Sequence, residues 1–371
     1  MKILRDPMLL LLLSLLLAWG VYEGGQPPEV KAANTPDSVF SAVRAEAVLQ
    51  RLYIDNKPHV AGSAANAEMR DRIISTLESF GYAPEIQSRF HCRPDIGWCS
   101  PVENIIAVHQ GRGGDSAILL TAHYDSGWAG PGVSDDGAGV AAILEMARMA
   151  AQQGEFEYSL MFLLTDGEEM GLIGADAFAR HNPLFERVKA VINLEARGST
   201  GASVMFETGP GNRGMIRMLA KNLERPVANS LTEEVYRRMP NDTDFSVYRN
   251  YDLPGVNFAF TQGASIYHSQ IDDLLHLDRG SLQHHGQNAW SMVQAMDERD
   301  LERITSSEQA AYIDLFGRKL LHYPLSSAAG LALVLSVLVL AAINRSFARQ
   351  IRFRELLWTF LGSVLLLIAV P

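Results

Sequence analysis

Three long apolar runs restrict the possible folds of this chain more than any other feature of its sequence. They occupy residues 117–122 (AILLTA), 159–164 (SLMFLL) and 188–194 (VKAVINL). Strands that are apolar almost throughout, rather than alternating with polar residues, are typical of a sheet with both faces buried. Because helical patterns separate these runs, we expect one α/β domain with a mostly parallel central sheet and helices on both faces.

Each apolar run leads into a side chain that can bind a metal. His123 and Glu195 follow the first and third runs, and Glu169 lies in the turn after the second. The carboxyl ends of parallel strands meet at one edge of an open sheet, where ligands bind. Two loop residues predicted near the same edge, Asp135 and His268, complete a set of histidine and carboxylate donors. Such a set suits a divalent ion, with zinc favoured.

The turn after the second run, TDGEEMG at residues 165–171, carries the adjacent pair Glu168 and Glu169. Two neighbouring carboxylates repel each other unless a cation or a proton relieves them. One could bind a metal while the other transfers a proton, as in metal-dependent hydrolysis. For this pair alone, a solvated acidic turn is the alternative.

Apolar segments at both ends predict attachment to a membrane. Residues 8–21 form an apolar run behind Lys2 and Arg5, which indicates an uncleaved anchor or a cleavable signal peptide. Residues 325–343 carry no charge and are long enough to span a bilayer, and a further apolar span begins at residue 358. The segment between them, 344–354, contains four arginines, and positively charged loops stay in the cytoplasm. The chain between residues about 25 and 320 is therefore expected on the extracytoplasmic or periplasmic side.

These observations divide the chain into an anchor or signal sequence at 1–24, an α/β domain at 25–320, and transmembrane helices with an arginine-rich cytoplasmic loop at 321–371. The end within an apolar span predicts a truncated multi-pass membrane protein. Cys92 and Cys99 lie in the outer portion with six residues between them. An oxidising compartment favours a local disulfide, and two unpaired thiols are the alternative. The net charge of −10 and the lack of a central basic patch argue against nucleic-acid binding.

Five spaced motifs within residues 40–300 together resemble the di-zinc exopeptidase family of bacterial leucyl aminopeptidase, aminopeptidase Y and glutamate carboxypeptidase. Two further stretches, residues 206–212 (FETGPGN) and 240–245 (PNDTDF), resemble its multi-pass membrane branch, typified by the endoplasmic reticulum metallopeptidase of animals. The five motifs are His123-x-Asp125, Ser134-Asp-Asp-x-x-Gly139, Asp166-x-Glu168-Glu169, Asn193-Leu-Glu195 and Tyr267-His268.

The resemblance implies a role for each motif residue. Asp135 would bridge two zinc ions, and the peptide bond after it would be cis. His123 and Glu195 would complete one zinc site, and Glu169 and His268 the other. Many relatives carry aspartate where this chain has Glu195.

The remaining motif residues would act around the metals rather than bind them. Glu168 would be the general base. Tyr267 would stabilise the developing oxyanion, and Asp125 would orient the His123 ring.

We therefore expect a membrane-anchored zinc aminopeptidase that acts on peptides. A glutaminyl cyclase, which resembles a single-zinc version of this fold, is one alternative, and a non-catalytic, receptor-like protein is another. Arg197 could pair with a substrate carboxylate and favour carboxypeptidase or dipeptidase action, although a surface arginine is the preferred interpretation. His59 is expected to pack in a loop, and His284 and His285 to be solvated on a late helix.

Overall fold

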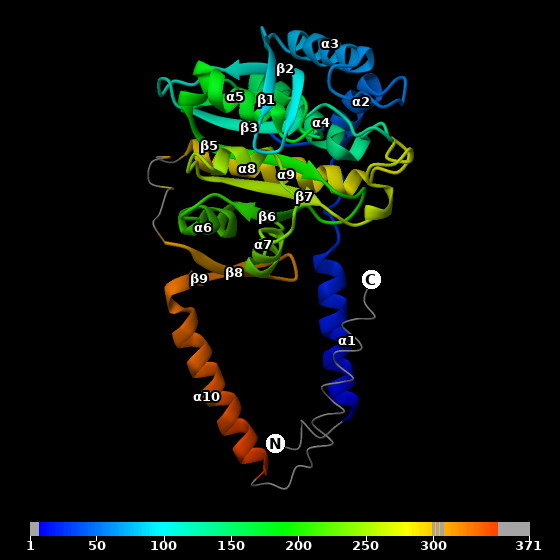
Figure 1. The fold of residues 1–371 in the computed structure, drawn as a ribbon. Coiled ribbons are helices and arrows are strands. Elements are labelled where there is room, and N and C mark those ends of the chain that lie inside the picture. Colours follow the sequence, from blue (N-terminus) through cyan, green and yellow to red (C-terminus); the bar gives the residue numbers. More distant parts are fainter. Residues whose placement is uncertain (1–6, 299–300, 302–303, 305–307, 348–371) are drawn as a thin grey trace.

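The three apolar runs form central strands of a seven-stranded sheet in the computed structural model, which describes residues 7–298, 301, 304 and 308–347 (Figure 1). The strands are β1 (Glu85–Arg93), β2 (Trp98–His109), β3 (Ala117–His123), β4 (Ser159–Thr165), β5 (Val188–Ala196), β6 (Val204–Thr208) and β7 (Gly255–Phe260). Their order is β1-β2-β4-β3-β5-β7-β6. The inner strands β4, β3, β5 and β7 are parallel, and β1, β2 and β6 pair antiparallel at the two edges.

Helices cover both faces of the sheet, as the sequence predicts. One face packs against α2 (Ala42–Leu52), α3 (Ala64–Ser79), α4 (Ala138–Gln153), α6 (Arg213–Asn222) and α9 (Arg279–Asp297). The other packs against α5 (Ile173–His181) and α8 (Asp244–Arg249), and a short helix, α7 (Ser230–Tyr236), lies against β6. Every residue of β3 and β4 is buried, which explains why these strands lack polar alternation.

The hairpin of β1 and β2 carries the disulfide. Cys92 and Cys99 are register partners across the hairpin, and their sulfur atoms are 2.06 Å apart. The predicted local pairing is confirmed. It closes the turn of an edge hairpin, where the Arg93 guanidinium donates to the backbone carbonyl of Gly171 in the turn after β4.

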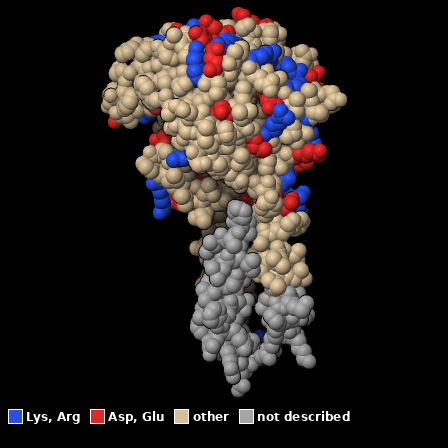
Figure 2. All heavy atoms as spheres, turned by 90° about the vertical axis from the view of Figure 1, so that its right-hand side faces the viewer, with Lys and Arg blue, Asp and Glu red and all other residues tan. Residues whose placement is uncertain are grey.

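Two helices extend from one side of the domain, α1 (Pro7–Gly24) and α10 (Ala328–Phe347) (Figure 1). Among the residues with a described placement, no helix combines the length and hydropathy needed to cross a membrane. The apolar span expected from residue 358, and most of the arginine-rich loop before it, lie outside the described residues. In Figure 2, charges of both signs are scattered over the visible face of the domain, whereas the described part of the stem below is nearly free of them.

A second, two-stranded sheet precedes α10. Its strands are β8 (Ala310–Leu315) and β9 (Lys319–Pro324), which pair antiparallel. This hairpin is not predicted from the sequence, because its residues fall at the boundary between the expected domain and the expected membrane segment. The hairpin lies at the base of the domain, against α6 and α7.

Candidate metal centre

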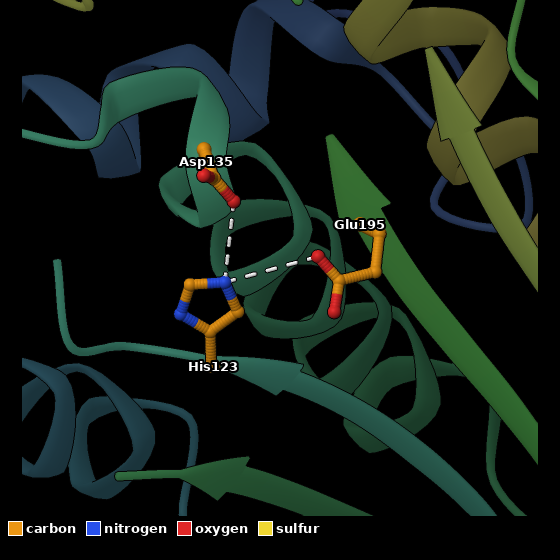
Figure 3. A group of neighbouring side chains, drawn as sticks. All are labelled: His123, Asp135 and Glu195. Carbon is orange, nitrogen blue, oxygen red and sulfur yellow. Dashed lines mark hydrogen bonds and ion pairs between the residues drawn. The ribbon is translucent and has the colours of Figure 1, made fainter. Parts of the chain in front are cut away.

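His123 ends strand β3 and points toward two carboxylates from other elements (Figure 3). Its Nε2 is 3.3 Å from Oδ1 of Asp135 and 3.8 Å from Oε2 of Glu195, the latter on β5. The opposite ring nitrogen, Nδ1, lies 2.9 Å from the backbone carbonyl oxygen of Asp125. That contact fixes the plane of the ring, so Nε2 is directed at the two carboxylates.

Asp135 lies in a short turn at Val133–Gly137, just before α4. The peptide bond between Asp135 and Asp136 is cis, as the family resemblance implies. Backbone N–H groups of Ser134 and Asp135 donate to the two carboxylate oxygens of Asp272, at 2.8 and 3.2 Å. With the backbone held in this way, one oxygen of Asp135 faces His123 and the other lies 3.2 Å from Nε2 of His268.

The Glu168–Glu169 turn is held by a single buried carboxylate. Asp125 accepts the backbone N–H of Glu168 at 3.0 Å and that of Glu169 at 3.3 Å. Oε1 of Glu169 is then 2.8 Å from Nε2 of His268, although the contact lacks hydrogen-bond geometry. The His268 nitrogen and the Glu169 oxygen thus lie close together without forming a hydrogen bond, as expected for two ligands that bind the same ion.

Two groups of three potential ligands result, and they share Asp135. His123, Asp135 and Glu195 form one group, and Asp135, Glu169 and His268 form the other. Within each group the ligand atoms all lie within 4.8 Å of one another. The structure therefore brings the five predicted ligands together, in the same two sets that the resemblance implies.

The electrostatics of this cluster favour a bound cation. Burial raises the pKa of Glu168 and of Glu195 well above the ordinary range of glutamate. Burial also acts to raise the pKa of Asp135, but hydrogen bonds from His123 and His268 outweigh it, and the net shift is downward. Buried carboxylates outnumber the histidines beside them, and divalent ions relieve such an excess of negative charge.

A cavity of about 240 Å³ opens beside the cluster. Asp135, Glu168 and Glu195 line its polar end. The rest of the wall is largely apolar and comes from Phe206, Ala259 and the segment of α7 and the loop after it: Thr232, Val235, Tyr236, Met239, Asn241, Asp242 and Thr243. The cavity is large enough for one substrate side chain.

Tyr267 and Arg197 also line the cavity. The Tyr267 ring stacks on the His268 ring, with centroids 3.8 Å apart. The Arg197 guanidinium lies 5.1 Å from the centre of the Tyr267 ring. Arg197 is exposed and forms no ion pair with any described residue. It is therefore a surface arginine that also faces the cavity, so both interpretations drawn from the sequence apply to it.

A family model for peptidase family M28 matches residues 104–293, just over half of the 371 residues. The matched stretch contains all five candidate ligands. The chain belongs to peptidase family M28. This confirms the predicted family.

Curated relatives of this M28 chain include membrane and reticulum proteins. Mouse endoplasmic reticulum metallopeptidase 1 is 30% identical over 231 residues, which cover 60% of this chain and 26% of the mouse protein. The vacuolar membrane protease of Candida albicans is 31% identical over 289 residues, covering 76% of this chain and 33% of the yeast protein. The chain thus spans about a quarter to a third of the length of these relatives.

Solved structures show the same fold. Porphyromonas gingivalis glutaminyl cyclase is 23% identical with a TM-score of 0.56, covering 70% of this chain and 99% of the cyclase. A Zn-dependent exopeptidase from Parabacteroides distasonis is 21% identical with a TM-score of 0.55, covering 69% of this chain and 98% of the exopeptidase. At these identities the two structures bear on the fold alone.

Three other histidines of the M28 chain belong to neither ligand group. His59 is buried in its loop and packs edge-on against Tyr53, as predicted. His284 and His285 are not solvated as expected, but fully buried on α9. Ser203 explains the burial, because its backbone N–H donates to His284 and its hydroxyl contacts Nδ1 of His285.

Two parts of the site are not predicted from the sequence. Asp272, which holds the backbone before and at Asp135, is one of several acidic residues after His268, and no pattern sets it apart. The cavity wall formed by α7 is also not predicted, because a helix of seven residues is too short to show a clear hydrophobic periodicity.

Proposed function

We propose that this chain is a zinc aminopeptidase with two metal sites that share Asp135. The observation that carries the proposal is the pair of three-ligand groups joined at that residue. The donors are histidine nitrogens and carboxylate oxygens, a set that fits zinc. When bound, two zinc ions supply a water of lowered pKa and polarise the carbonyl group of the scissile bond.

The residues of the chain provide the proton transfer. Glu168 is not a member of either ligand group, yet it lines the cavity beside Asp135 and Glu195. Its backbone is fixed by the Asp125 carboxylate. Glu168 is thus placed to take the proton of the attacking water and to return it to the leaving amine. Tyr267, held between His268 and Arg197, is placed to donate from its hydroxyl to the developing oxyanion.

The cavity supports a preference for a terminal residue with an apolar side chain. Phe206, Val235, Tyr236 and Met239 would surround that side chain. Transfer of its apolar surface from water contributes about 25 cal/mol per Å² buried. We assign Asp135 and Glu195, at the polar end of the cavity, to the metals and Glu168 to proton transfer.

Arg197 favours a second candidate, cleavage next to a free carboxyl terminus. It is exposed at the cavity and has no ion-pair partner among the described residues, so a substrate carboxylate could bind there. The structural similarity to a glutaminyl cyclase supports a third test substrate, a peptide with N-terminal glutamine.

We also propose that the domain is attached to a membrane and faces away from the cytoplasm. The names of the two relatives support this location, as do the charge asymmetry of the C-terminal segment and the disulfide. The exposed leucines of α1 and α10 also support a membrane location.

One substrate panel separates these activities. The full chain would be assayed on aminoacyl p-nitroanilides, N-blocked peptides with a free carboxyl terminus, and a peptide with N-terminal glutamine, each with and without a zinc chelator. We expect chelator-sensitive release of p-nitroaniline, fastest with leucine or phenylalanine. Ammonia release from the glutamine peptide without any hydrolysis would establish the cyclase instead, and activity on N-blocked peptides alone would establish the carboxypeptidase.

A further inference from the structure

The β8–β9 hairpin exposes an apolar face. Alternate residues of the hairpin, Tyr312 and Leu320, are buried, at 4% and 6% exposure. The intervening residues form the opposite face, where Ile313, Leu315, Leu321 and Tyr323 are 54%, 41%, 50% and 37% exposed. Antiparallel sheets with one face in water normally carry polar residues on that face. A contiguous apolar face marks an interaction surface.

The direction of this face follows from what covers the other one. The Tyr312 hydroxyl donates to Glu233 and its backbone N–H donates to Ser230, both on α7. Helices α6 and α7 therefore lie on the inner face of the hairpin. Because successive side chains of a strand point to opposite sides, Ile313 and its exposed neighbours face away from the domain.

The hairpin also connects the two terminal helices. At its turn, a Cβ on Gly24 would lie 2.7 Å from Cα of Phe316, so the end of α1 is in backbone contact with the hairpin. At its other end, β9 leads through Leu325–Ser327 into α10. Both helices extend on the same side of the domain (Figure 1). The six residues of β9, roughly 20 Å long, therefore cross the base of the domain between the two helices.

The connection to α1 is more than a single contact. The Arg225 guanidinium donates to the backbone carbonyl of Glu23 at 2.7 Å, and the N–H of Ala202 donates to that of Gly25 at 3.1 Å. The end of α1 is thus fixed to the domain, and the domain cannot tilt freely about it.

Aromatic residues mark the level at which the helices leave the domain. Trp19 and Tyr22, in the last turns of α1, are 62% and 47% exposed, and Tyr323 lies at the end of β9. Tryptophan and tyrosine concentrate at the boundary between lipid and water, where their rings are apolar and their polar atoms stay hydrated. Beyond them, α1 exposes a run of leucines.

Basic residues adjoin the apolar face. Arg318 in the hairpin turn and Lys319 at the start of β9 are exposed, and neither forms an ion pair with a described residue. Near an anionic membrane surface each such residue contributes about 1 kcal/mol. We propose that the outer face of the hairpin, formed by Ile313, Leu315, Leu321 and Tyr323, rests in the interfacial layer of a lipid bilayer, with this basic pair against anionic headgroups.

This inference rests on the membrane location proposed above and adds a defined orientation to it. Helix α7 packs on the inner face of the hairpin and also supplies Thr232, Val235 and Tyr236 to the wall of the substrate cavity. Contact of the hairpin with lipid would therefore hold the cavity at a fixed distance from the membrane surface.

Depth-dependent quenching tests the proposal in the full chain. The chain would be reconstituted in vesicles of phosphatidylcholine and phosphatidylglycerol, with Leu321→Cys or Ile313→Cys labelled by an environment-sensitive fluorophore. No described cysteine is free, because Cys92 and Cys99 are paired, so the label is specific. The control is Ile54→Cys, a 70% exposed apolar residue between α2 and α3.

We expect a blue shift at positions 313 and 321, and quenching by lipids that carry a nitroxide near the headgroup several-fold stronger than at position 54. Equal quenching at all three positions, in chains that float with the vesicles, would overturn the proposal while leaving membrane attachment intact. Chains that fail to float with vesicles would overturn the membrane location and the inference with it. The chelator-sensitive peptidase assay is independent of both results.

Discussion

The Asp125 carboxylate accepts the backbone N–H groups of both Glu168 and Glu169. One side chain therefore sets the positions of a proposed metal ligand and of the proposed base. The orienting contact to His123 comes mainly from the backbone carbonyl of Asp125, at 2.9 Å, because the carboxylate is 3.5 Å from Nδ1. The carboxylate acts on the turn more than on the ring.

This arrangement predicts the effect of Asp125→Asn. The amide oxygen can accept one of the two N–H groups, but the amide nitrogen would face the other as a second donor. We expect zinc affinity to fall by about 10–100-fold. Competition with a chelating dye measures the affinity, and Asp115→Asn, at an exposed aspartate that precedes β3 at the end opposite His123, is the matched control. An unchanged affinity would remove Asp125 from this role.

Substitution of Glu168, the proposed base, should lower turnover without changing metal binding. Glu168→Gln should leave the metal content unchanged, because Glu168 belongs to neither ligand group. Peptidase turnover should fall by about 10²–10⁴-fold, the usual contribution of a general base. Metal analysis and kcat would be measured on the same sample, with Glu155→Gln, whose side chain is 74% exposed, as the control. Turnover within a few-fold of the unsubstituted chain would exclude Glu168 as the base.

The ligand residues were accessible to sequence analysis because each follows an apolar strand or a distinctive loop. His123 ends β3, and Glu195 lies one residue before the end of β5, so the strand pattern alone places them at one sheet edge. The contacts between these side chains could not be predicted from the sequence. Which atoms of Asp125 face the ring and which face the turn depends on the loop conformation, and Asp272 has no local sequence signal.

Among the elements, α9 shows how tertiary packing overrides a local pattern. His284 and His285 are polar and adjacent, which indicates a solvated helix face. Both are buried, since Ser203 and the backbone carbonyl of Arg225 supply partners that the helix sequence does not reveal. The α7 helix and the β8–β9 hairpin are missed for a related reason: both are short and are stabilised by contacts with each other.

The buried histidines make stability depend on pH. Burial lowers the pKa of His284 to about 4 and that of His285 to about 3. The unfolded histidines bind protons below about pH 6.5, where the folded ones remain neutral, so stability falls as the pH falls through this window. At pH 5 each histidine should reduce the free energy of unfolding by roughly 2 kcal/mol.

His285→Gln isolates that contribution. The variant should lose less stability than the unsubstituted chain between pH 7 and pH 5, by roughly 2 kcal/mol, because one titrating group is absent. Urea unfolding at the two pH values, monitored by circular dichroism, measures the difference. An unchanged pH dependence of stability in His285→Gln would contradict the assignment.

For the whole molecule, the sheet positions the candidate ligands at one edge, while the base of the domain carries the hairpin and the terminal helices. The fold class was predictable because buried parallel strands have an unmistakable composition. The position of the cavity relative to the base was not predictable, since it depends on how α7 joins β6 to the hairpin. That connection brings the substrate cavity and the proposed lipid-facing surface onto two sides of one short helix.

The zinc stoichiometry of the chain tests whether two zinc ions share Asp135. The purified full chain would be analysed for bound metal by mass spectrometry, together with Asp135→Asn. We predict two zinc ions per active chain and a loss of zinc in the variant, because the shared ligand serves both sites. A fully active chain with a single zinc ion, or with none, would contradict the account.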